Sequence, residues 1–98
     1  MSADGVWKTT VHAPLGVQEG RLTIHTEGGG FTGEYAGRYG SHLVTGQVHG
    51  DRLIWTSKIA LPFPITLDFD VTVAGDVMEG SVSGGPSVGA TPFRGVRA

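Results

Sequence analysis

The sequence contains no cysteine and no asparagine, and only 16% of its residues are charged. Without cysteine, the chain can form neither disulfides nor thiolate metal sites. Without asparagine, it has no N-glycosylation acceptor. Seven basic residues against nine acidic ones leave a net charge of −2, spread without runs of either sign. We expect no nucleic-acid partner, because a phosphate-binding surface needs clustered positive charge.

Long apolar stretches are missing as well. No apolar run approaches the ~20 residues with which a helix crosses a bilayer. The first residues, Met1 to Gly5, show neither the basic region nor the apolar core of a secretory signal. The sequence therefore predicts a soluble protein without a membrane span, with the cytoplasm as its default location. A length of 98 residues predicts one domain, covering residues 1–98.

Glycine, in contrast, is abundant, with 17 residues. The glycines follow no three-residue period, which excludes a collagen-like chain. They occur in turn-like clusters and at single positions inside strand-like runs. Together with frequent threonine and valine, this composition indicates β-structure. No segment keeps a 3.6-residue period, so we expect no helix.

Apolar and polar residues alternate along eight segments, as they do in strands with one buried face. The clearest alternation runs from Ile65 to Val73. The expected strands cover residues 6–12, 20–26, 31–35, 44–49, 52–59, 65–73, 78–82 and 93–97. One apolar face per strand and short connections predict an antiparallel sheet wrapped around its own core. We expect an all-β, up-and-down barrel of about eight strands, with a two-sheet β-sandwich as the alternative.

The connections differ between the two ends of such a barrel. Three tight turns would meet at one end, here called the floor, and they cover residues 27–30, 49–52 and 74–76. Four longer connections would meet at the other end, the mouth, and they cover residues 12–19, 36–42, 60–64 and 83–91. Because long loops on a rigid scaffold often carry function, we expect a ligand at the mouth.

Gly5-Val6-Trp7 opens the first expected strand, and Arg97 closes the last one. This arrangement resembles the calycin superfamily of lipocalin- and avidin-type barrels, in which a G-x-W tryptophan plugs the floor beneath a basic residue from the last strand. The resemblance implies a lipocalin-like barrel with Trp7 and Arg97 as its structural floor. Strand parity also points both side chains inward.

Residues 30–35 look like the glycine-rich third strand of avidins, but of the avidin biotin-binding tryptophans only Trp55 has a counterpart here. Biotin binding is therefore not implied. The early tryptophan, a Pro-x-Pro loop and a final G-x-R are also similar to a group of short, uncharacterised bacterial proteins. That likeness implies no function.

Two short motifs stand in the wrong context. Residues 28–33 match G-x-G-x-x-G, but the dinucleotide-binding motif requires a helix to begin there, where we expect a strand. Residues 85–89 match G-x-S-x-G, but a nucleophile elbow requires a strand–turn–helix corner. Neither motif predicts its usual chemistry, and we expect no cofactor.

Of the four histidines, His12, His25 and His49 have outward parity, and no two lie two or four residues apart. We therefore expect no metal site. His42 has inward parity at the mouth, where an imidazole with a pKa near ~6.5 suits acid–base chemistry or contact with a ligand.

The segment Leu61-Pro62-Phe63-Pro64 stiffens one mouth connection while it presents apolar surface. It is either a rigid connection over the barrel top, a hydrophobic gate, or a patch for self-association.

Three functional hypotheses remain open. In the first, the barrel takes a small, largely apolar molecule through its proline-rich mouth. The expected ligand-binding residues are Tyr35, Tyr39, His42, Ser57, Phe63, Ile65 and Leu67, with further aliphatic walls from Val44 and Ile59. In the second, His42 or a mouth tyrosine is the catalytic acid–base of a cofactor-free isomerase, hydratase or cyclase. In the third, a packed barrel acts by self-association, for instance as a homodimer, or through a protein partner. An interior filled by Trp55, Phe69 and Met78, without a cavity above ~300 Å³, would remove the first two as stated.

Overall fold

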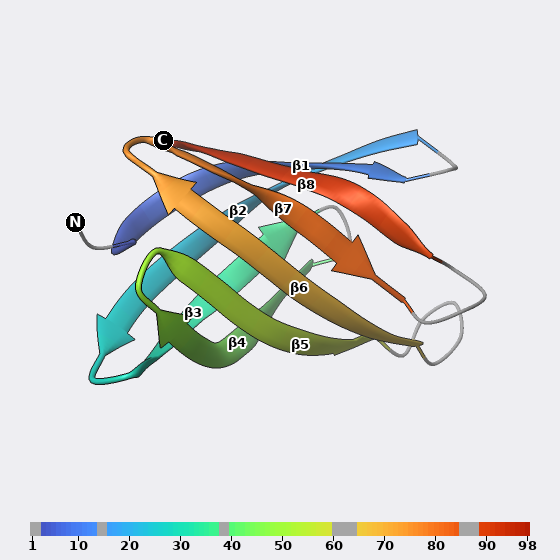
Figure 1. Cartoon of the computed structure of the whole chain (residues 1–98). Helices are drawn as coiled ribbons and strands as arrows, with labels where there is room; N and C mark the ends of the chain where they lie inside the picture. Colours follow the sequence, from blue (N-terminus) through green and yellow to red (C-terminus); the bar gives the residue numbers. More distant parts are fainter. Residues whose placement is uncertain (1–2, 14–15, 38–39, 60–64, 85–88) are drawn as a thin grey trace.

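A computed structural model of the chain shows a closed barrel of eight antiparallel strands (Figure 1). The structure describes residues 3–13, 16–37, 40–59, 65–84 and 89–98. The strands are β1 (Gly5–Ala13), β2 (Gly16–Glu27), β3 (Gly30–Gly37), β4 (Gly40–His49), β5 (Arg52–Ile59), β6 (Ile65–Ala74), β7 (Val77–Ser83) and β8 (Ala90–Arg97). Each strand pairs with the next along the chain, and β8 closes the barrel on β1. The predicted up-and-down barrel is confirmed, and the sandwich is excluded.

The described part of the chain has no helix that is long and apolar enough to cross a membrane.

The floor of the barrel is formed by the turns that join β2 to β3, β4 to β5, and β6 to β7. Gly28, Gly50 and Gly75 adopt φ values of +61°, +64° and +64° in these turns. Glycine reaches this left-handed region without steric cost, which explains the tight connections. In Figure 1 the three turns and the C-terminus lie at the left, and the mouth lies at the right.

Two of the mouth connections are shorter than expected. β1 and β2 pair as far as Ala13 and Gly16, and β3 and β4 pair as far as Gly37 and Gly40. The predictions of loops over residues 12–19 and 36–42 were therefore too long. Glycine and histidine obscure the alternation in these segments, whereas pairing with a neighbouring strand extends the ladder through them. Tyr39 and residues 60–64, including Phe63, lie outside the described residues.

Aromatic side chains fill the middle of the barrel. The rings of Trp55 and Phe69 stack at a centroid distance of 4.6 Å, and the edges of Phe31 and Phe93 meet Trp55 at 5.6 and 5.9 Å. A Cβ atom at Gly46 would overlap both Phe31 and Trp55, so glycine there makes room for the cluster. Below it lie fully buried side chains, among them Trp7, Leu22, Leu53, Val71 and Met78. These side chains leave the described barrel interior filled.

Two of the eight strand junctions end early on the mouth side, for different reasons. The β1–β8 ladder stops at Val11↔Phe93, and the next residue of β8 is Pro92. Proline has no N–H to donate, which ends this ladder. The β4–β5 ladder holds only four pairs, from His49↔Arg52 to Gly46↔Trp55, and contains no proline on either side. Beyond Gly46 no described residue of β4 pairs with β5.

Candidate functional site

The candidate site is the inner surface between the aromatic cluster and the mouth, where several inward side chains are only partly covered. Inward residues of the described chain in this region include Thr9, Val11, Tyr35, His42, Ser57 and Leu67, and Thr9 lies beside the cluster, nearer the floor than the Val11↔Phe93 pair. Thr9 and Ser57 are buried, at 1% and 7% exposure. Val11, Tyr35 and Leu67 are half-buried, and His42 is exposed. The half-buried and exposed side chains thus form a shallow surface at the mouth, and Thr9 and Ser57 are buried beneath it.

The position of Tyr35 depends on a glycine in the neighbouring strand. The Tyr35 phenol lies where a side chain at Gly20 would stand, so that a Cβ atom there would overlap the phenol oxygen. Gly20 in turn pairs with Thr9 on β1. The phenol oxygen of Tyr35 and the hydroxyl of Thr9 therefore approach the same part of the inner surface from β3 and β1.

The Thr9 hydroxyl is the unusual group of this surface. Its Oγ1 is buried and has no hydrogen-bond partner among the described residues. A buried hydroxyl without a partner costs about 1–3 kcal/mol, and native proteins retain few of them. Such a group calls for a partner beyond the described residues, for instance a water molecule or a ligand atom. Thr9 is missing from the ligand set expected from the sequence, where its inward parity was the only signal.

His42 lies at the rim of the site. It pairs directly with Tyr35 across β3 and β4, and the two rings lie 5.7 Å apart at an angle of 44°. This contact joins two of the residues expected to bind a ligand. Because His42 is exposed, its imidazole can reach a ligand only at the rim.

The other expected ligand-binding residues are spread more widely. Ser57 and Leu67 pair with each other on β5 and β6, and the junction between β4 and β5 separates them from His42. Ile65 pairs with Ile59 at the mouth end of the same hairpin, and neither side chain is among those described. The remaining two, Tyr39 and Phe63, lie outside the described residues.

At the floor, Arg97 covers Trp7. The guanidinium carbon lies 4.4 Å from the centre of the indole ring, a geometry of cation–π contacts. Arg97 also donates to the backbone oxygen of Asp4 at 2.8 Å and forms an ion pair with Asp76 at 3.0 Å. The indole N–H of Trp7 donates to the backbone oxygen of Ala3 at 2.9 Å. These contacts satisfy the polar groups around Trp7 and close this end of the barrel.

A small pocket also lies at the floor, with a volume of about 140 Å³. Its lining residues are Ala3, Thr26, Gly28, Val48, Gly50, Asp51, Leu53 and Val73. Ligand pockets usually measure ~300–1,000 Å³, so this one is too small for a metabolite-sized molecule.

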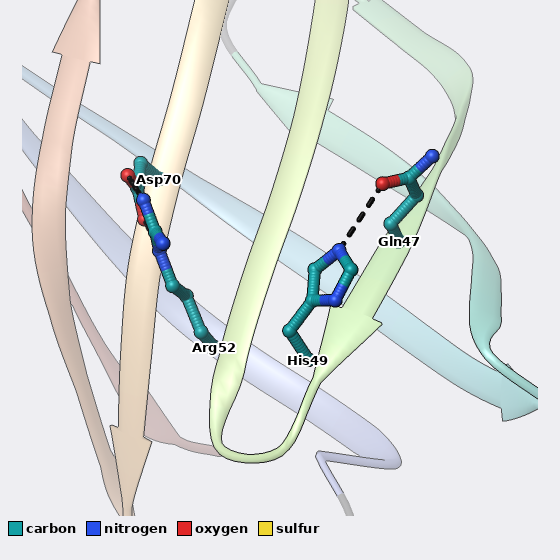
Figure 2. A network of polar contacts seen from close by, with 4 residues as sticks. All are labelled: Gln47, His49, Arg52 and Asp70. Atoms are coloured by element: carbon teal, nitrogen blue, oxygen red, sulfur yellow. Dashed lines mark hydrogen bonds and ion pairs between the residues drawn. The ribbon is translucent and has the colours of Figure 1, made fainter.

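The outer surface near the β4–β5 turn carries a polar network (Figure 2). The Arg52 Nε donates to Asp70 Oδ1 at 2.8 Å, and a second contact joins Arg52 Nη2 to Asp70 Oδ2. The hydrogen bond from Arg52 lowers the pKa of Asp70 below its usual value. Alongside, His49 Nε2 lies 3.2 Å from Gln47 Oε1. Within the described residues, no three His, Cys, Asp or Glu side chains converge to hold a metal ion.

Comparison with known proteins adds no family to this picture. No protein-family model matches the chain, and no curated protein matches it in sequence.

Proposed function

We propose that this chain is a small-molecule-binding module. Its ligand has an apolar body and one hydrogen-bonding group, and it lies on the shallow inner surface at the mouth. The observation that carries the proposal is the buried Thr9 hydroxyl, which has no partner within the described chain. Because the hydroxyl is buried, the ligand has to displace the half-buried side chains that cover it, and the hydrogen bond that it then supplies recovers the free energy that an unpartnered hydroxyl costs.

The surroundings of Thr9 support a ligand of this class. Val11 and Leu67 offer half-buried aliphatic surface, and Tyr35 offers an aromatic face. Small-molecule sites combine mostly apolar walls with a few well-placed polar groups, and this surface has that composition. The packed aromatic cluster beneath provides a rigid base, so little ordering is required on binding.

The resemblance to calycin-type barrels agrees with this proposal, since those barrels bind small molecules from their open end. Trp55, Phe69 and Met78 fill the described interior, so the first hypothesis does not hold as stated, with a ligand taken into the barrel. The site proposed instead is a surface at the mouth, shallower than a calycin cavity. We therefore expect modest affinity and a ligand with only a few non-hydrogen atoms in contact with the barrel.

Nuclear magnetic resonance titration with matched probe pairs tests the proposal. Para-cresol and cyclohexanol carry one hydroxyl each, whereas para-xylene and methylcyclohexane are their hydrocarbon counterparts. The hydroxyl-bearing probes should shift the amide signals of Thr9 and Tyr35 and bind about tenfold more tightly than the hydrocarbons, since one hydrogen bond contributes about 1 kcal/mol or more in a buried site.

Thr9→Val removes the hydroxyl and should abolish the preference for the hydroxyl-bearing probes. The matched control is Thr32→Val, an exposed threonine on the outer face of β3, which should leave that preference unchanged. Binding of none of the four probes, or equal affinities within each pair, would count against the proposal.

The contact between Tyr35 and His42 favours a second function, acid–base catalysis on a ligand held at the same rim. His42→Ala separates the two functions. For a binding module it should change probe affinity only modestly, because His42 is exposed. For an isomerase, hydratase or cyclase, it should abolish turnover while affinity is largely kept.

A further inference from the structure

The junction between β4 and β5 leaves backbone hydrogen-bonding groups unused. The neighbouring β3–β4 ladder continues to Gly37↔Gly40, and the β5–β6 ladder continues to Ile59↔Ile65. Between β4 and β5, pairing stops at Gly46↔Trp55. In Figure 2 the two strands leave their common turn beside His49 and Arg52 and then diverge.

The alternation of backbone bonds identifies which groups face this seam. Val48 N–H donates to the Gly29 oxygen at 2.9 Å, so the even-numbered residues of β4 bond to β3. In an antiparallel sheet successive residues bond to opposite neighbours, and Leu43 and Thr45 therefore direct their N–H and C=O groups toward β5. The register would place Lys58 and Thr56 opposite them, but none of these described residues is paired across the seam. This stretch of β4 is an open strand edge.

The composition of β4 does not protect that edge. Among the eight described strands, β4 alone contains no Asp, Glu, Lys or Arg, and it contains no proline. Natural proteins block pairing at open edges with lysine, proline or bulges. The β5 side of the seam carries such a residue, Lys58. On the β4 side, Leu43 points outward and is 81% exposed.

We propose that this edge of β4 pairs with the same edge of a second copy of the chain. An antiparallel arrangement about a two-fold axis at Leu43 sets Leu43 against Leu43 of the second copy and Ser41 against Thr45. Residues directly opposite share one face, so apolar meets apolar and hydroxyl meets hydroxyl. No like charges face each other, because the strand carries none. This self-complementarity favours a second copy over an unrelated strand.

The pairing extends the sheet of each barrel across the two-fold axis. Each Leu43 would pack against its counterpart and lose solvent exposure, and the free N–H and C=O groups of Leu43 and Thr45 would be satisfied. A closed two-fold contact of this kind stops at two subunits and forms no fibre. The inference depends on backbone pairing alone and is independent of the role proposed for Thr9.

Sedimentation velocity over a wide concentration range, combined with amide hydrogen exchange, tests this inference. The wild-type chain should form dimers as concentration rises, and the Leu43 and Thr45 amides should become protected in the same range. Leu43→Lys should raise the dimer dissociation constant by at least about tenfold, because it sets two lysines opposite each other. Thr45→Pro should act in the same direction, since it removes an N–H that the barrel itself does not use.

Val17→Lys is the matched control, because Val17 is another exposed apolar residue, at 55%, on a strand away from the seam. It should leave the dissociation constant unchanged. A chain that stays monomeric at every concentration would overturn the inference. So would dimers that Leu43→Lys and Val17→Lys weaken equally, or edge amides that are protected only by an unrelated extended peptide.

Discussion

The phenol of Tyr35 occupies the space above Gly20 in which any other residue would carry its Cβ atom. The Tyr35 ring can take this position only because residue 20 of β2 is a glycine, which has a hydrogen atom in place of a side chain. This position also brings the Tyr35 phenol next to the strand position that pairs with Thr9. The candidate site therefore depends on a glycine that contributes no chemistry of its own.

Gly20→Ala should destabilise the barrel by about 1–3 kcal/mol, because the new methyl group overlaps the phenol and overpacks the inner surface. Chemical denaturation monitored by tryptophan fluorescence measures this change. Gly29→Ala is the control, since no atom lies within 4 Å of a Cβ at that position. Combining Gly20→Ala with Tyr35→Leu should cost less than the sum of the two single changes, and strict additivity would contradict the proposed overlap.

Thr9→Val should stabilise the ligand-free chain by about 1 kcal/mol, since it replaces a buried, unpartnered hydroxyl with a methyl group of similar size. The same denaturation experiment measures it, with Thr32→Val as an exposed counterpart. A loss of stability in Thr9→Val would mean that the hydroxyl has a partner in solution, such as a bound water molecule. If Thr9→Val stabilises the chain and also loses the preference for hydroxyl-bearing probes, then the hydroxyl that lowers the free energy of unfolding is the same group that binds the probe.

The ion pair between Arg52 and Asp70 predicts a pH dependence. The hydrogen bond from Arg52 lowers the pKa of Asp70 in the folded chain. The pair therefore contributes stability above the usual aspartate pKa of ~3.9, and that contribution is lost as pH falls through the lowered folded value. Because both side chains are about half-exposed, at 54% and 44%, we expect a small effect that added salt reduces.

Titration of the Asp70 carboxyl carbon by nuclear magnetic resonance checks this dependence directly. In Arg52→Gln the pKa of Asp70 should rise toward its usual value. An unchanged Asp70 titration in that variant would assign the shift to another cause.

Arg97→Lys should lower the free energy of unfolding by about 1 kcal/mol, because lysine replaces the planar group that covers Trp7 while it also donates to Asp4 and Asp76. Arg94→Lys is the matched control on the same strand, since Arg94 forms a long ion pair with an exposed residue, Glu79, at 3.8 Å. Equal effects of the two changes would show that the contact with Trp7 adds nothing beyond a surface charge.

Much of the fold follows from the sequence, but the site follows from it only in part. Alternation in the segment from Ile65 to Val73 identifies a strand and its buried face without any structural information. The same parity places Tyr35 and His42 on one face, and the structure brings their rings together. Parity does not reveal that the Thr9 hydroxyl has no partner among the described residues, because that depends on side chains from strands that are distant along the chain.

Where each ladder ends could be anticipated at one junction and not at the other. Pro92 cannot donate to β1, so the end of the β1–β8 ladder is visible in the residue type. Nothing in residues 40–45 or 56–59 forbids pairing, and yet β4 and β5 separate beyond Gly46. The separation coincides with the aromatic cluster at Trp55, whose packing arises only when the whole barrel closes.

The sequence by itself indicated about eight antiparallel strands, the tight turns at one end and the side of the sheet on which most strand residues lie. These properties are local, because the period of two along a strand and the short connections set them residue by residue. The tertiary structure decided that aromatic side chains fill the interior, that Tyr35 lies across Gly20 above Thr9, and that β4 keeps an open edge. These features depend on how eight strands share one interior volume, which no single segment specifies.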